Sequence, residues 1–428
     1  MRISTSQIFD SGTRGISQNQ SDLYKLQNQL STGRRVLTPE DDPIASAQAL
    51  VLTQSQSVTA QFVTNQGDAK DKLGITNNQL SSLVDLLQNV RQRIVQAGST
   101  TLTNSDRSDI SKDLEASFSD LMGIANAQDG AGNYLFSGYQ GAVKPFSATA
   151  TGANYAGDEG KRLLQVAASR QIPTNVSGSE LFQLVRNGNG TFTTATGGNT
   201  AGGINQGTGI IDQGSVTNLP LWNQGLAAGY GNVEVRFSVN PAGVTQYDLY
   251  NATTATLISA APTNFTPGQA IALKDTTTVP VVDLGASVVI EGNPAAGDRF
   301  LVSPSANQSI FTTLRNTINT VNQGVGTVAA GNSSTEYSND LAGNLQAIDQ
   351  ALENVSQMQA TVGSHLKELD SLGTAAQDQA LQYSTSLSAL QDLDWTKAIS
   401  EQSQVQLQLQ AAQLSFKQTS DLSLFKIL

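Results

Sequence analysis

Few side chains in this sequence could carry out chemistry. The 428 residues include no cysteine and a single histidine, His365. Without a thiol the chain has no disulfide, thiolate metal site or cysteine nucleophile, and one histidine is too few for a multi-histidine metal centre. A Ser-His-Asp triad would have to use His365. Because His365 lies beside Leu366 inside a helical seven-residue pattern, we expect it at the exposed edge of a helix rather than in a catalytic site.

One compact acidic cluster, Glu40-Asp41-Asp42, lies between Pro39 and Pro43. It fits either a cation site or a proline turn that places carboxylates near the start of the next helix. We favour the turn, because acidic side chains stabilise helix N-termini. In the middle of the chain the acidic residues are scattered, and no pair has a spacing that demands acid–base catalysis.

Glycine-rich stretches at 197–198 and 202–209 invite comparison with phosphate-binding loops. No Lys-Ser or Lys-Thr follows them, and no clear strand-to-helix context surrounds them. We therefore expect flexible loops there. The sequence predicts no catalytic residue, no cofactor and no metal site.

The charge balance limits the choice of partners. With 24 Lys and Arg against 35 Asp and Glu, the net charge is −11, so we expect no nucleic-acid partner, because binding phosphate backbones needs basic patches. No apolar run reaches the roughly 18 residues of a membrane span, so we expect no membrane insertion. The first ten residues lack the apolar core of a cleaved signal peptide.

Helical patterns dominate both terminal thirds of the chain. In the first third, apolar residues recur every seven positions in two interleaved series, as in a coiled-coil seam: Leu73, Leu80, Leu87 and Ile94, with Leu83, Val90 and Ala97. In the last third, one series runs unbroken through Leu341, Ile348, Val355, Val362, Leu369, Ala376, Tyr383 and Leu390. A helix with one long apolar stripe needs a partner, and the two thirds supply one for each other.

The middle third shows strand patterns. Val233–Val239 alternates apolar and polar residues, as a half-buried strand does. Further strands are expected at 162–167, 246–250, 279–284, 288–291 and 299–302, and the stretch 292–298 has the glycines and proline of a chain reversal. These features predict an antiparallel β domain.

The expected fold class is therefore α+β: an elongated antiparallel helical bundle or coiled coil made from both chain ends, with an antiparallel β domain inserted in the middle. We expect five segments: terminal helical assembly segments at 1–40 and 395–428, bundle segments at 41–145 and 306–394, and the β domain at 146–305.

Both chain ends carry more large apolar residues than fraying termini normally keep. Exposed together they would be a liability in a monomer, so we expect neighbouring copies to bury them. The alternative is that both tails fold back on the bundle. The predicted assembly interface consists of Ile3, Ile8, Phe9, Ile16, Leu23, Leu30, Val405, Leu409, Ala412, Phe416, Leu422, Leu424, Phe425 and Leu428.

Several separated motifs occur along the chain. The N-terminal stretch 26–43 contains Gly33, Arg34, Arg35, Pro39, Asp41, Asp42 and Pro43, and the stretches 132–139, 292–300, 394–401 and 409–416 follow it. In this order the motifs resemble those of the bacterial flagellin superfamily, and within it those of the hook-filament junction (hook-associated protein 3) family. The resemblance covers both helical thirds and both edges of the β region, but not 186–285.

The resemblance implies a non-enzymatic structural subunit of the extracellular flagellum, exported without a cleaved leader through the flagellar type III apparatus. The implied partners are flagellin, hook-associated protein 1, further copies of the chain in a ring, and an export chaperone. The alternatives are flagellin or hook-associated protein 1 itself, a helical sensor or adhesin module, and a secreted enzyme with its site on the β domain.

Overall fold

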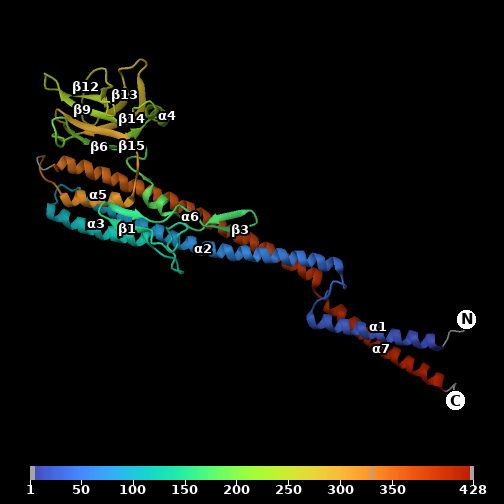
Figure 1. The fold of residues 1–428 in the computed structure, drawn as a ribbon. Coiled ribbons are helices and arrows are strands. Elements are labelled where there is room, and N and C mark those ends of the chain that lie inside the picture. Colours follow the sequence, from blue (N-terminus) through green and yellow to red (C-terminus); the bar gives the residue numbers. More distant parts are fainter. Residues whose placement is uncertain (1–4, 329–330, 425–428) are drawn as a thin grey trace. The chain divides into compact units, whose positions relative to one another are not determined.

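Helices come from both ends of the chain and strands from its middle (Figure 1). The computed structural model describes residues 5–328 and 331–424. In this part of the chain the helices are α1 (Thr5–Thr32), α2 (Pro43–Ala97), α3 (Asn104–Ala125), α4 (Leu219–Ala227), α5 (Ile310–Gln323), α6 (Ser334–Gln391) and α7 (Trp395–Leu424), with one π-helical turn, η1 (Ser179–Gln183). The predicted α+β class, with helical ends and an inserted antiparallel β domain, is confirmed.

Two compact units divide the chain. Unit 1 holds the described residues up to Gly67, the short stretch Gln165–Arg170 and the described residues from Asp370 onward; unit 2 holds Asp68–Leu164 and Gln171–Leu369. The division falls inside α2 and α6. The segment boundaries expected at 40/41 and 394/395 lie at the breaks between α1 and α2 and between α6 and α7.

In unit 2 the α2 and α6 stripes are buried as the seven-residue pattern predicts. Leu73, Leu80 and Leu87 of α2 are at most 1% exposed, and Leu341 to Leu369 of the α6 series are also buried. Gln359 Nε2 donates to Ser81 Oγ (2.9 Å), and Arg91 Nε lies 2.7 Å from Asp349 Oδ1. From the first contact to the second, the residue number rises along α2 and falls along α6, so the two helices are antiparallel.

Arg107 on α3 closes the C-terminal end of α2. Its guanidinium donates to three carbonyl oxygens that follow or end the helix, those of Ala97 (3.3 Å), Ser99 (3.0 Å) and Leu102 (2.7 Å). The Arg107 side chain is buried and lies over the Tyr337 ring, 5.1 Å from its centroid. A cation at a helix C-terminus pairs with unsatisfied carbonyls, so the end of α2 is ordered by unit 2 itself.

A cluster of phenylalanines joins the helices of unit 2 to the first strands. Phe136, Phe146, Phe182 and Phe311 are fully buried, with neighbouring ring centroids 5.1–5.7 Å apart, a spacing at which aromatic pairs attract. Phe118 of α3 extends the cluster, 6.0 Å from Phe311. The stretch 132–139 therefore ends the first helical section by placing Phe136 in this core.

Two antiparallel sheets and α4 form a β sandwich in unit 2 (Figure 1). One sheet has the order β11-β10-β9-β15-β6, with β12 beside β10; the other has the order β13-β14-β7, with β8 beside β14. Their inner faces share a core that includes Trp222, Phe192, Val235 and Phe300. The strands of the chain are β1 (Phe146–Thr149), β2 (Gly152–Tyr155), β3 (Leu163–Ala167), β4 (Arg170–Pro173), β5 (Val185–Arg186), β6 (Phe192–Asn199), β7 (Ile210–Ile211), β8 (Ser215–Val216), β9 (Val233–Val239), β10 (Thr245–Asn251), β11 (Thr256–Leu257), β12 (Thr263–Asn264), β13 (Ala270–Asp275), β14 (Val282–Glu291), β15 (Asp298–Pro304) and β16 (Asn307–Gln308).

The expected strand Val233–Val239 is β9 with the same bounds. The expected strands 279–284 and 288–291 overlap one strand, β14, which begins at Val282. The strand runs on through Gly285, which has a positive φ and lies at a register shift in the pairing with β13. The sequence analysis missed β6, β13 and α4. The threonines, alanines and glycines of β6 and β13 give no clear apolar alternation, and α4, with nine residues, is too short to show a helical repeat.

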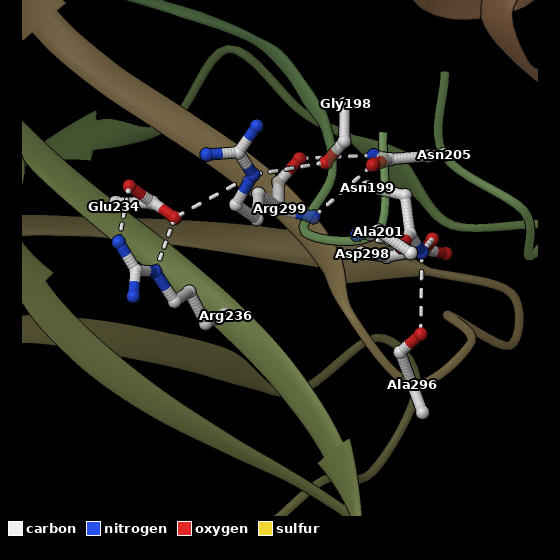
Figure 2. Close-up of polar contacts among 9 residues, drawn as sticks. All are labelled: Gly198, Asn199, Ala201, Asn205, Glu234, Arg236, Ala296, Asp298 and Arg299. Atoms are coloured by element: carbon white, nitrogen blue, oxygen red, sulfur yellow. Dashed lines mark hydrogen bonds and ion pairs between the residues drawn. The ribbon is translucent and has the colours of Figure 1, made fainter. Parts of the chain in front are cut away.

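The first glycine-rich stretch, 197–198, lies in a strand, which corrects the expected loop there, whereas 202–209 has no helix or strand and is a loop as expected. Gly197 and Gly198 lie inside β6, and the chain that follows is fixed to β15 around Asp298 (Figure 2). The fully buried Asp298 carboxylate accepts from the main-chain N–H groups of Gln206 (2.7 Å), Gly207 (2.9 Å) and Ala295 (2.8 Å), and from Asn199 Nδ2 (2.9 Å). A buried carboxylate with this many donors is satisfied, and it already takes the main-chain N–H groups of Gln206 and Gly207 that a phosphate-binding loop would offer.

Candidate assembly surface

Helices α1 and α7 of unit 1 pack side by side, so the two chain ends lie together (Figure 1). The rings of Phe9 and Phe416 meet edge to face, with centroids 5.3 Å apart. Gly12 makes this approach possible, because a Cβ there would lie 2.9 Å from Phe416 Cδ2. The seam between the two helices is therefore built from an aromatic pair and a residue without a side chain.

The structure places the predicted interface residues along this seam, where described. Phe9, Ile16, Leu23, Leu30, Val405, Leu409, Ala412 and Phe416 are each partly buried, none of them fully. Ile3, Phe425 and Leu428 lie outside the described residues, and the side chains of Ile8, Leu422 and Leu424 are not described either. Contact of these residues with neighbouring copies remains a prediction. Within one chain, Phe9 and Phe416 contact each other.

The opposite face of α7 carries a second set of apolar residues, which the sequence analysis missed. Ile399, Leu407 and Leu414 are 51%, 67% and 61% exposed; together they form the α7 outer stripe. Successive residues turn by about 100° around a helix, which puts Leu407 and Leu414 roughly opposite Val405, Leu409 and Phe416 and places Ile399 on the flank next to them. The signal that could have found them is the seven-residue step from Leu407 to Leu414.

The motif at 33–43 forms a corner between the two helix breaks of unit 1. Gly33 ends α1 with a φ of 69°, which favours glycine. Its carbonyl accepts from the Leu393 N–H (2.9 Å), and the Arg35 N–H donates to the Gln391 carbonyl (2.7 Å). Arg34 pairs with Asp392 as an isolated antiparallel bridge. The break between α1 and α2 is thus hydrogen-bonded to the break between α6 and α7.

Asp41 anchors the turn of this corner. Lys25 Nζ lies 2.6 Å from its Oδ1, and its Oδ2 accepts from the N–H groups of Leu37 (2.9 Å) and Thr38 (3.0 Å). The Lys25 ammonium, followed by these two N–H donors, lowers the pKa of Asp41 to about 2. Pro39 lies inside the turn, between Thr38 and Asp41.

Asp42 begins α2. Its Oδ1 accepts from the Ala45 N–H (2.9 Å), and Pro43 occupies the first helical position, where no N–H is needed. The Ala45 N–H, and after it Arg35 at 3.2 Å, lower the pKa of Asp42. Arg35 also donates through Nη2 to the Leu390 carbonyl (2.8 Å). The acidic cluster is thus the turn and helix cap that we favoured over a cation site.

Other kinds of site find little support in the described residues. His365 is partly exposed on α6, and its Nδ1 lies 3.9 Å from Glu368 Oε2, an ordinary helix-surface contact. No group of three His, Cys, Asp or Glu side chains within 5–328 and 331–424 could hold a metal ion. In the same ranges, none of the helices carries an apolar stretch sufficient to cross a lipid bilayer.

The fold and the corner at 33–43 together define a class of proteins. In this class, helices from the two chain ends pair with each other, and a β domain is inserted in the middle of the chain. Residues 3–141 match the profile of the bacterial flagellin N-terminal helical region, and residues 345–428 match that of the C-terminal helical region. The two ranges cover just over half of the chain and include both helix breaks of the corner. The chain belongs to the bacterial flagellin superfamily, whose members are structural proteins of the flagellum.

Among the most similar proteins are flagellar hook-associated proteins 3. Those of Salmonella typhimurium and Escherichia coli are 37% and 35% identical to this chain over 185 residues, which is 43% of this chain and 58% of each relative. The chain thus spans little more than half the length of these relatives. The crystal structure of hook-associated protein 3 from Legionella pneumophila superposes with a TM-score of 0.70 at 26% identity, covering 79% of this chain and 98% of that one.

Proposed function

We propose that this chain is a structural subunit of the bacterial flagellum that forms the junction between hook and filament, on which flagellin polymerises. The observation that carries the proposal is the 37% identity over 185 residues with a hook-associated protein 3. The pairing of α1 with α7 supports it, because it gathers both family-matched chain ends into one helical surface.

The partners follow from this role. The chain would contact hook-associated protein 1 on the hook side, flagellin on the filament side and its own copies in a ring, after export through the flagellar apparatus with a chaperone. The exposed α7 outer stripe supports the contact between copies, because large apolar side chains grouped on one exposed face mark protein interaction sites. The half-exposed seam residues would complete their burial in the same assembly.

The alternative function is that of flagellin itself, or of another flagellin-like axial protein such as hook-associated protein 1. Such a protein would carry the same chain-end helical regions. The identity with hook-associated protein 3 favours the junction.

Deletion of the gene tests the proposal. We expect cells that build hooks without attached filaments and release flagellin into the medium, and we expect the wild-type gene to restore filaments. Electron microscopy of the cells and immunoblotting of flagellin in the medium measure both effects. Normal filaments in the deletion strain would contradict the junction role and leave an auxiliary one; loss of flagellin synthesis or export alone would point to the alternative.

A further inference from the structure

The first part of α2, in unit 1, presents an apolar face that nothing in the described chain covers. Ile44, Val51 and Val58 recur every seven residues and are 72%, 65% and 41% exposed; they form the α2 stripe. From Pro43 to Gly67 the sequence contains no charged residue. A seven-residue apolar repeat on an uncharged helix face is the pattern that receives a second helix.

The α2 stripe continues into a groove of about 470 Å³ within unit 1. Its walls come from α2, from the tip of the β3–β4 hairpin and from α6, and include Val58, Phe62, Val166, Leu372, Ala376 and Tyr383. The other lining residues are small or uncharged polar ones, so the groove suits an occupant that is apolar and uncharged.

The α7 outer stripe has the matching chemistry. The sequence from 402 to 416 contains no charged residue, and glutamines, which are amide donors, flank the stripe at 404, 406, 408, 410 and 413. At 1.5 Å per residue, Ile399 to Leu414 spans about 22 Å and Ile44 to Val58 about 21 Å. The two stripes thus agree in length, in apolar character and in lack of charge.

We propose that the α7 outer stripe of a second copy of this chain packs along the α2 stripe. The α7 outer stripe is free for this contact because α7 pairs with α1 through its opposite face. The inference rests on the proposed function in that it assumes assembly of copies, but it names the surfaces that meet.

The natural absence of cysteine allows a direct test. Val51→Cys and Leu407→Cys place one thiol at the centre of each stripe, so the expected proximity does not depend on the direction of the second helix. Cells lacking the wild-type gene would make both single variants together, and their isolated flagella would be treated with a bismaleimide. We expect a cross-linked product of twice the chain mass. Ala60→Cys replaces Val51→Cys in the control, because Ala60 is exposed about 180° around the same helix.

The outcomes separate this inference from the proposed function. A product with Val51→Cys but not with Ala60→Cys supports the pairing. Swimming cells with attached filaments and no Val51–Leu407 product would overturn the pairing while leaving the junction role intact. A product between Val51→Cys and a protein of different mass would overturn it as well, because the groove would then hold another partner. Failure of the wild-type gene to restore filaments would instead count against the proposed function.

A charge variant gives a second measurement. Val51→Asp would bury an unpaired carboxylate in the contact, so we expect its amount in isolated flagella to fall by more than about tenfold. Ala60→Asp is the matched control and should be incorporated normally. Circular dichroism of both purified variants should equal that of the wild type, since both positions are exposed in the monomer. Normal incorporation of Val51→Asp would overturn the pairing.

Discussion

Apolar residues recur every seven positions along helix α2 in both units, but they are buried in unit 2 and exposed in unit 1. In unit 2 its large residues, such as Leu80, face α6 and are buried, whereas in unit 1 Ile44 and Val51 point away and are mostly exposed. There the buried face consists of small or polar residues, Ala45, Ala49 and Thr59. Unit 2 therefore uses its apolar residues for its own stability, and unit 1 leaves them exposed, where the proposed contact between copies would bury them.

The largest expected effect tests the buried half of this comparison. Leu80→Ala removes a side chain that is 0% exposed and leaves a cavity between α2 and α6, so we expect the free energy of unfolding of unit 2 to fall by about 3 kcal/mol. Chemical denaturation followed by circular dichroism measures it. Val51→Ala is the matched control in the exposed half and should change stability by less than about 0.5 kcal/mol. Equal losses of stability in the two variants would contradict the idea that only the unit 2 part of α2 uses its apolar residues for stability.

An intermediate effect is expected at the end of α2 in unit 2. Arg107→Met removes the donors to the carbonyls of Ala97, Ser99 and Leu102 and the guanidinium over the Tyr337 ring, so we expect a loss of about 2 kcal/mol in the free energy of unfolding and faster amide exchange at 98–103. Thermal unfolding and hydrogen exchange measure the two effects. Lys112→Met on the exposed face of α3 is the control. If Lys112→Met lost as much stability and exchanged its amides as fast at 98–103, the hydrogen bonds of Arg107 would not be what orders the end of α2.

The smallest effect concerns the other end of α2, in unit 1, and depends on pH. Because the pKa of Asp41 is lowered to about 2 from an ordinary 3.8, its carboxylate stabilises the corner above pH 4 and loses this effect as pH falls toward 2. Since Lys25 is half exposed, we expect only about 1 kcal/mol.

In Asp41→Asn this contribution is absent at every pH. The stability difference from the wild type should therefore be present at pH 5 and vanish near pH 2, as measured by urea unfolding at each pH. The difference between the two proteins isolates Asp41 from the other carboxylates, which titrate in both. A difference that stays constant between pH 5 and pH 2 would show that the corner does not depend on the charge.

The sequence predicted those elements best that bury one face, because their apolar residues then recur with one regular spacing. The stripes of α2 and α6 in unit 2 and the strand β9 are of this kind, because burial on a single side leaves a readable pattern. Helix α7 has apolar residues on two opposite faces, so the predicted set contained Val405 and Phe416 of the seam but not Leu407 or Leu414 of the outer stripe. The Asp298 site joins residues about 90 positions apart, and no local pattern predicts such a pairing.

The corner at Gly33 to Asp42 determines how twist travels through unit 1. A single covalent linker between two helices swivels about its φ and ψ angles, so rotation on one side is lost in the linker. Here two linkers run side by side and are joined by main-chain hydrogen bonds at Gly33, Arg35, Gln391 and Leu393. Neither can swivel without breaking bonds to the other. A rotation of the α1–α7 pair about its axis should therefore also rotate the adjoining ends of α2 and α6.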